Sequence, residues 1–416
     1  MIRQCCQYWL DLWSGCVGPG PLGLWLFALV MVAGQAMAAP VVKDVRLGHQ
    51  GQVTRFVLET DGAIDFQVFS LIDPYRIVID VSEVNFGSRD HGKGLGAVEN
   101  YRFGLFKPGT SRVVLDLKSP ALVKQAFVIP PRQGYGHRLV VDLAATNRAA
   151  FMAALRLPEE AAQIVSRAPS VGAQSPAALR AERKRKLIVL DPGHGGVDPG
   201  ASSVKGRMEK SITLAIARVI RDELEKSGVY TVQLTRDQDI FIPLRQRFEI
   251  ARAAGADMFI SLHADSFRTA DVRGASIYTL SETASDREAE LLAAKENKAD
   301  IIAGINLAGE EPEVSNILID LARRETMTFS THFAGILVSE LGKVTTMRKN
   351  SHRYAGFLVL KAPDVPSVLF EMGYLSNPAD AAALEDRRHQ QRIAHALRQA
   401  LDTYFLKLAS HQVSSM

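Results

Sequence analysis

The first part of the chain alternates short apolar runs with polar turns, a pattern typical of β-strands. Runs of this kind, rich in β-branched residues, occupy residues 55–60, 66–71, 75–81, 112–117, 124–129 and 137–143. The motif RFVLE at 55–59 resembles RVVLD at 112–116, and RIVID at 76–80 resembles RLVVD at 138–142. This internal duplication predicts a small all-β domain with two sheets over residues 39–145. Because we find no cluster of catalytic residue types in this region, a binding or targeting module is the expected role.

From residue 187 the pattern changes to strands that alternate with helices. Apolar runs predict strands at 187–191, 230–235, 258–263 and 367–371, and helical spacing predicts helices at 210–226, 243–254 and 380–405. This alternation predicts an α/β domain over residues 187–408, with a mostly parallel sheet and helices on both faces. Residues 146–186 are rich in Ala, Arg, Ser and Pro and form the expected linker between the two domains.

The first 38 residues have the pattern of a secretory signal peptide. The apolar run at 22–33 is too short to cross a bilayer comfortably, and Ala36, Met37 and Ala38 match a small-x-small cleavage site. We therefore expect export by the general secretory route and a mature chain that starts near Ala39, with no transmembrane segment. An uncleaved membrane anchor is the alternative.

Composition restricts the chemistry that is available to the mature chain. A net charge of +4 is too weak to indicate nucleic-acid binding, and no aromatic-basic motif accompanies it. All three cysteines, Cys5, Cys6 and Cys16, precede the expected cleavage site. The mature chain therefore has no thiol for catalysis, and any metal ion must be held by histidines and carboxylates.

Four side chains suited to metal binding or proton transfer fall near the ends of predicted elements. His194 follows the first predicted strand of the α/β domain, while His263 and Glu371 each end a later one; Glu209 lies at the start of the first helix. Because the carboxyl ends of parallel strands line the ligand crevice of open α/β sheets, we expect these side chains to converge. Two histidines and one carboxylate, with an open position for water, form a typical hydrolytic zinc site. The second carboxylate can then transfer a proton.

These motifs resemble those of the zinc-dependent N-acetylmuramoyl-L-alanine amidases of the amidase_3 type. The resemblance covers residues 187–406 and rests on DPGHGG at 191–196, Glu209, ISLHAD at 260–265 and FEMGYLSN at 370–377. It implies one Zn²⁺ held by His194, Glu209 and His263, with Glu371 as the catalytic acid/base. The implied reaction is hydrolysis of the amide bond between N-acetylmuramic acid and L-alanine in peptidoglycan, for cell-wall remodelling and daughter-cell separation.

The N-terminal β domain similarly resembles an AMIN domain, a module that binds peptidoglycan and targets the septum. Together with the signal peptide, this resemblance implies a periplasmic protein. A zinc peptidase that cuts another bond of the same polymer, and a non-catalytic scaffold that binds the envelope, are the competing hypotheses.

The α/β domain also contains an expected insertion over about residues 280–345. Its segment ENKAD at 296–300 resembles the regulatory insertion of the cell-division amidases. In that subgroup an insertion helix covers the zinc until an activator with a LytM-type domain displaces it. We therefore hypothesise that Glu296, or alternatively Glu290, is an inhibitory zinc ligand. An ordinary solvated helix face is the competing interpretation.

Three further residues lie near the predicted site. Arg236 and Arg247 are expected either to fix loops at the sheet edge or to bind substrate carboxylates, and Asn377 to orient the loop that carries Glu371. The remaining histidines of the α/β domain are expected at the surface; they are His332, His352, His389 and His395.

Overall fold

The structure is a computed structural model of the 416-residue chain. It describes residues 39–71, 74–87, 91–132, 134–154, 185–305 and 317–414. The predicted signal peptide with its cleavage site, and most of the predicted linker, lie outside these residues. Within the described ranges, no helix combines the length and the apolar character needed to cross a bilayer.

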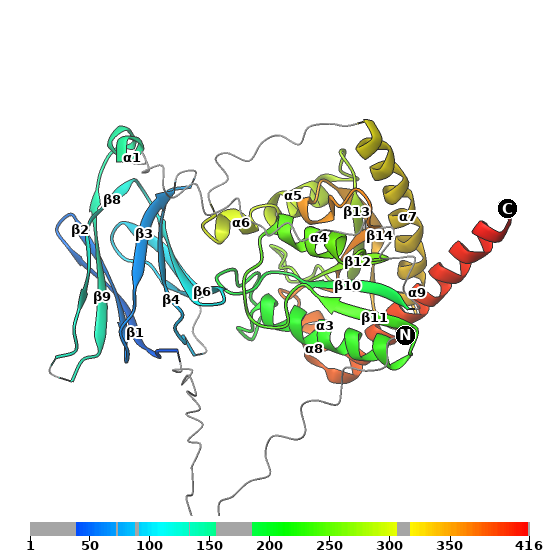
Figure 1. The fold of residues 1–416 in the computed structure, drawn as a ribbon, viewed down its shortest axis with the longest axis horizontal. Coiled ribbons are helices and arrows are strands. Elements are labelled where there is room, and N and C mark those ends of the chain that lie inside the picture. The colour runs from blue at the N-terminus through cyan, green and yellow to red at the C-terminus, as the bar shows by residue number, and fades with distance from the viewer. Residues whose placement is uncertain are drawn as a thin grey trace, which may run out of the picture. The chain divides into compact units, whose positions relative to one another are not determined.

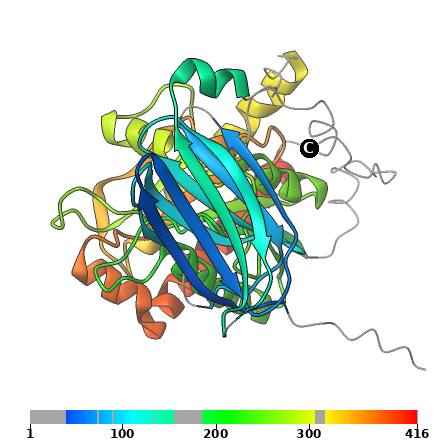
Figure 2. The ribbon, with the colours of Figure 1, turned by 90° about the vertical axis from the view of Figure 1, so that its left-hand side faces the viewer.

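The β domain consists of two antiparallel sheets, whose strands run side by side in Figures 1 and 2. The first sheet has the order β1 (Val42–Gln50), β2 (Val53–Thr60), β9 (His137–Ala145), β8 (Ala121–Ile129). The second has the order β3 (Phe66–Leu71), β4 (Arg76–Ser82), β7 (Thr110–Leu117), β6 (Val98–Lys107), β5 (His91–Lys93). Alternate residues of both sheets, among them Phe56, Ile79 and Leu115, form one buried core. The predicted two-sheet β domain is therefore confirmed.

The duplicated motifs occupy equivalent positions in the two sheets. Arg55 on β2 lies opposite Asp142 on β9, and Arg112 on β7 lies opposite Asp80 on β4. The sequence pattern missed β1, β5 and β6. Strand β1 is an edge strand with many partly exposed polar residues, so its apolar alternation is weak.

The α/β domain is built on a six-stranded sheet. Its order is β11 (Tyr230–Leu234), β10 (Lys186–Pro192), β12 (Met258–His263), β15 (Ser367–Glu371), β13 (Ala275–Leu280), β14 (Met347–Ala355). Strands β13 and β15 pair antiparallel, and every other neighbouring pair is parallel. The predicted mostly parallel sheet is confirmed, although the sequence pattern missed β13 and β14.

Helices cover both faces of this sheet (Figure 1). Buried residues of α3 (Glu209–Lys226), α7 (Ile317–Leu341) and α9 (Arg387–Ser414) share one core with the sheet. Residues of α4 (Leu244–Ala253), α5 (Arg287–Glu296) and the 3₁₀ helix η2 (Leu358–Leu360) share the core on the other face. Two short helices are α1 (Arg148–Ala154), at the start of the predicted linker, and α6 (Ala299–Ile302), which follows α5.

Two expectations about the C-terminal part are wrong. The predicted helix 380–405 is divided into α8 (Pro378–Glu385) and α9, because Asp386 has an extended backbone and its carboxylate accepts a hydrogen bond from the His389 backbone nitrogen. His389 was expected at the surface but is buried, and His352 is half-buried with its ring 3.1 Å from the Thr279 hydroxyl. Tertiary packing covers these two rings, whereas His332 and His395 are exposed.

Candidate active site

The loop after β10 has a backbone conformation that depends on its glycines. His194 adopts φ 61°, and Gly195 and Gly196 follow with φ 128° and 56°. A left-handed conformation is strained for histidine and is found mostly where the surrounding structure enforces it. A Cβ atom on Gly193 would lie 2.5 Å from the His263 ring. The DPGHGG motif therefore brings the loop against His263 at a distance that no other residue type permits.

Two buried arginines hold this loop in place. Arg236 donates hydrogen bonds to the carbonyl oxygens of Pro192 (2.9 Å) and Gly193 (2.8 Å). Arg247 donates to the His194 carbonyl oxygen (2.9 Å) and forms an ion pair with Asp191 (3.0 Å). Burial, and then the charge of Arg247, lower the pKa of Arg236 to about 10. Both guanidinium groups therefore contact the backbone of the loop that carries His194.

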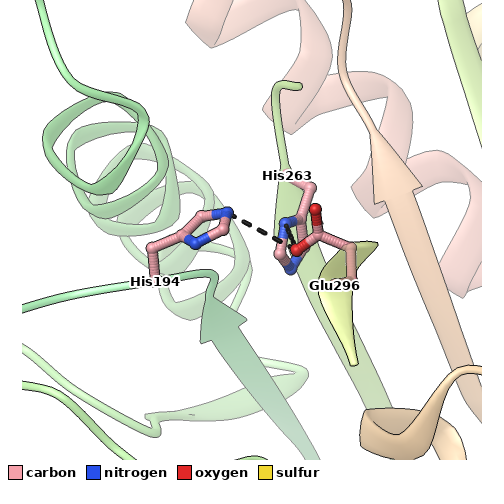
Figure 3. A group of neighbouring side chains, drawn as sticks. All are labelled: His194, His263 and Glu296. Carbon is pink, nitrogen blue, oxygen red and sulfur yellow. Dashed lines mark ion pairs between the residues drawn. The ribbon is translucent and has the colours of Figure 1, made fainter. Parts of the chain in front are cut away.

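His194, His263, Glu209 and Glu296 meet in one buried cluster. Figure 3 shows both histidine rings in ion-pair contact with one oxygen of Glu296. Glu209 presents one carboxylate oxygen to each ring, 3.1 Å from His194 Nε2 and 3.3 Å from His263 Nδ1. Glu296 Oε2 lies 3.5 Å from the same nitrogen of His194 and 3.3 Å from that of His263. The cluster joins residues 194, 209, 263 and 296, which come from three separate elements and a loop.

The donor atoms of this cluster fit a metal ion. His194 Nε2 and His263 Nδ1 are buried, and neither has a hydrogen-bond partner. Unpartnered buried polar atoms are rare in proteins because desolvation without a hydrogen bond is unfavourable. In a tetrahedral zinc site, two ligand atoms are roughly 3.3 Å apart. The distances between the histidine nitrogens and the carboxylate oxygens of this cluster are close to that value. The group formed by His194, His263 and Glu296 could therefore bind a metal ion.

Asp198, which was not among the residues predicted from the sequence, supports this cluster. Its carboxylate lies 2.8 Å from His194 Nδ1, on the side of the ring opposite Nε2. A carboxylate at this place fixes the tautomer and orientation of a metal-binding histidine. The sequence signal was an aspartate four residues after the histidine, in the same glycine-rich loop.

Glu371 lies beside the cluster on the neighbouring strand. It is the register partner of His263 across β12 and β15, and its Oε2 accepts a hydrogen bond from the Asp265 backbone nitrogen (3.1 Å). Its other oxygen is buried without a hydrogen-bond partner. Burial raises the pKa of the Glu371 carboxyl group well above its usual range, and the charges of Asp265 and Glu209 raise it further.

Helix α5 covers the cluster and brings Glu296 to it. The space lined by the two histidines, Glu296, Asn297 and Ala299 is a cavity of about 10 Å³. A cavity of this size holds no more than about one water molecule. Glu290, the alternative inhibitory residue, lies outside the cluster: it is exposed and pairs with Arg287 (2.7 Å).

Asn377 organises the segment that follows Glu371. Its side-chain oxygen accepts hydrogen bonds from the backbone nitrogens of Ala379 (3.0 Å) and Asp380 (3.1 Å), which caps α8. Its amide group donates to the Ala270 carbonyl oxygen (2.6 Å). These contacts tie the start of α8 to the backbone at residue 270.

Comparison with known proteins is consistent with this site. Residues 188–403 match the Amidase_3 family, described as N-acetylmuramoyl-L-alanine amidase, and residues 44–143 match the AMIN domain. The chain is 35% identical to N-acetylmuramoyl-L-alanine amidase AmiC of Neisseria meningitidis, over 92% of this chain and 96% of that protein. It is 34% identical to AmiC of Escherichia coli, over 93% and 94% of the two chains.

The chain is also similar to a solved structure, the catalytic domain of the amidase CwlV from Bacillus (Paenibacillus) polymyxa var. colistinus. The alignment covers 53% of this chain and 98% of the CwlV chain, at 25% identity and a TM-score of 0.38. The match to Amidase_3 spans more than half of the chain, and the two AmiC proteins align over nearly its whole length. The chain belongs to the N-acetylmuramoyl-L-alanine amidase family.

Proposed function

We propose that this amidase is a periplasmic, zinc-dependent enzyme of cell-wall remodelling and daughter-cell separation, and that Glu296 holds it inactive. One observation carries the proposal: the unpartnered nitrogens of His194 and His263 flank a single carboxylate oxygen of Glu296, at 3.5 and 3.3 Å. The same two nitrogens also lie against the carboxylate of Glu209. Three residues would then hold Zn²⁺, and a fourth would occupy the position that the reaction needs open.

The residues that would hold the ion are His194, His263 and Glu209. Zn²⁺ bound there would supply Lewis-acid chemistry, polarising the scissile carbonyl group and acidifying water. Glu209 suits this role because its two oxygens also accept hydrogen bonds from the backbone nitrogens of Ala264 (2.8 Å) and Ala201 (2.9 Å). These bonds fix the orientation of the carboxylate between the two rings.

Glu371 is the residue that we assign to proton transfer. As a carboxylate it takes a proton from the attacking water, whose oxygen bonds to the lactyl carbonyl carbon of N-acetylmuramic acid. The carbon–nitrogen bond then breaks, and Glu371 returns the proton to the nitrogen of the leaving L-alanine. The raised pKa of the buried Glu371 carboxyl group suits both proton transfers. A higher pKa makes the carboxylate a stronger base toward water, and it keeps the proton bound until the leaving nitrogen takes it.

Inhibition by Glu296 follows from the space around the cluster. A cavity of about 10 Å³ admits no part of a glycan strand or stem peptide, so α5 must leave before substrate can bind. An activator with a LytM-type domain that displaces α5 would meet this requirement. Residues 44–143, which match the AMIN domain, would bind peptidoglycan and place the enzyme on its substrate.

The experiment is digestion of purified sacculi by the mature chain, with and without chelator, read by mass spectrometry. We expect stem peptides with a free N-terminal alanine, which a peptidase acting on another bond would not release. Glu296→Ala should raise the basal rate, whereas the exposed Glu290→Ala is the matched control and should not. Glu371→Gln should retain zinc but lower the rate by about 10²–10⁴-fold.

Two results would contradict the proposal. Hydrolysis that is unaffected by metal removal would exclude zinc dependence. A folded Glu296→Ala protein no faster than Glu290→Ala would exclude inhibition by Glu296.

A further inference from the structure

Two arginines of the β domain hold the end of the segment that carries Glu296. Their partners are the backbone carbonyl groups of Ile302, the last residue of α6, and of Ala303 and Gly304, which follow it. Arg102 donates to the Ile302 oxygen through Nε (3.0 Å) and one terminal nitrogen (2.6 Å). Arg112 donates to the oxygens of Ala303 (3.0 Å) and Gly304 (3.2 Å). The last carbonyl groups of a helix lack partners within it, and here arginine side chains supply them.

Each arginine is itself fixed by an aspartate on the adjacent strand. Arg112 forms two hydrogen bonds with Asp80 (2.6 and 2.7 Å), and Arg102 pairs with Asp116. Bidentate pairing leaves the guanidinium group with one orientation, so its remaining N–H groups point at the segment without a further loss of side-chain freedom. The side chain of Arg112 is 7% exposed and that of Arg102 is 14% exposed, so these ion pairs are shielded from solvent.

The segment also covers an apolar part of the same sheet. Val78 on β4 and Val114 on β7 are fully buried, although they lie on the face opposite the core of the β domain. A Cβ atom on Gly304 would lie 2.7 Å from Val78 Cγ2, so the chain approaches this face as closely as glycine allows. The contact therefore combines apolar burial with hydrogen bonds from charged donors.

Strand β6 also contacts the loop that carries His194. A Cβ atom on Gly104 would lie 2.5 Å from the backbone of Gly196, and the Leu105 oxygen accepts a hydrogen bond from the Phe241 nitrogen (3.3 Å). The second sheet of the β domain thus contacts both the fixed loop and the inhibitory segment of the catalytic domain.

The first sheet carries an equivalent arginine–aspartate pair that does not contact residues 302–304. Arg55 and Asp142 form two hydrogen bonds of 2.6 and 2.7 Å in the register that Arg112 and Asp80 have in the second sheet. The Arg55 side chain is 50% exposed, whereas that of Arg112 is 7% exposed. The internal duplication therefore provides a matched pair of sites, of which one holds the inhibitory segment.

We infer that the outer face of β4, β7 and β6 is the docking surface for residues 302–304, and that this contact helps to keep Glu296 in the active site. The inference rests on the proposed function, in which Glu296 is inhibitory. Only seven residues separate Glu296 from Gly304, and Asp300 between them accepts a hydrogen bond from the Leu244 nitrogen (2.9 Å). Releasing the end of α6 therefore loosens a short segment that reaches the metal-binding cluster.

The test compares Arg112→Gln with Arg55→Gln in the full mature chain. Arg112→Gln removes both charge-assisted hydrogen bonds to residues 303 and 304. It should shift the equilibrium toward the open segment by about tenfold or more, because the loss of one such bond already corresponds to about tenfold. Deuterium uptake by residues 285–305 and basal hydrolysis of sacculi should both rise. Arg55→Gln removes the same kind of ion pair from the same domain and should change neither.

A second variant reaches the contact from the other side. Gly304→Ala leaves the β domain unaltered, but its Cβ atom would lie 2.7 Å from Val78 Cγ2, and the φ of 73° at this position is unfavourable for alanine. Both effects disfavour the docked segment, so Gly304→Ala should act in the same direction as Arg112→Gln. Glu296→Ala is the reference. If Glu296→Ala is activated while Arg112→Gln and Gly304→Ala match the wild type in uptake and rate, this inference is wrong. If Glu296→Ala is not activated either, inhibition by Glu296 itself is wrong.

Discussion

Asp198 and His194 form a buried pair, with 2.8 Å between the Asp198 carboxylate and His194 Nδ1. Because this contact occupies one ring nitrogen, the other is left to face Glu209 and Glu296. Asp198→Asn should lower zinc affinity by about 10–100-fold, the usual effect of losing such a support. Zinc competition with a chromogenic chelator measures this directly. The exposed Asp237→Asn is the control, and equal affinities for the two variants would show that Asp198 does not tune the site.

The ion pair between Lys295 and Asp265 connects α5 to a residue that contacts Glu371. The Lys295 ammonium pairs with the Asp265 carboxylate, and the Asp265 nitrogen donates to Glu371. Because Lys295 is nearly half exposed, the pair is partly screened by solvent. Lys295→Gln should therefore raise basal hydrolysis of sacculi by only about two- to fivefold. Lys298→Gln, on the exposed side of the same segment, should have no effect; equal rates for both variants would rule out a contribution from this ion pair.

Gly193 is predicted to be indispensable for metal binding rather than for folding. A Cβ atom there would lie 2.5 Å from the His263 ring, whose Nδ1 is held 3.3 Å from Glu209. Gly193→Ala should displace the ring and reduce bound zinc, measured by atomic emission on purified protein. Gly335→Ala in α7 meets no atom within 4 Å and should retain zinc while stabilising the helix by about 1 kcal/mol. Full zinc content in Gly193→Ala would show that metal binding does not require glycine at this position.

The Arg55–Asp142 pair predicts an acid-dependent loss of stability in the β domain. Hydrogen bonding from Arg55 lowers the pKa of Asp142, outweighing the opposing effect of burial. A group whose pKa is lower in the folded state stabilises that state above its unfolded pKa, about 3.9, and this stabilisation is lost as the pH falls further. Because Arg55 is half exposed, the effect should be about 1 kcal/mol or less.

Hydrogen exchange of β2 and β9 in Asp142→Asn checks this prediction. These strands should exchange faster than in the wild type at pH 7, and the difference should shrink below about pH 4. The exposed Asp65→Asn should leave exchange of both strands unchanged. A difference between Asp142→Asn and the wild type that persists at pH 3 would assign the effect to packing instead of charge.

The sequence by itself determined which histidines and carboxylates could be expected to converge at the candidate site. His263 and Glu371 end predicted strands, and His194 follows one in a run of glycines. Strand periodicity and glycine requirements are local properties, and parallel strands place their carboxyl ends at one sheet edge, so convergence could be expected without coordinates. The duplicated motifs of the β domain were readable for the same reason.

Only the tertiary structure decided how distant segments meet. The orientation of α5 brings Glu296, and not Glu290, to the histidines. Packing directs the guanidinium groups of Arg236 and Arg247 toward backbone carbonyl groups. The contact of Arg112 with residues 303 and 304 joins parts of the chain that are 191 and 192 positions apart. No local pattern encodes such a contact, because it depends on how whole elements pack and on which backbone groups are left without partners.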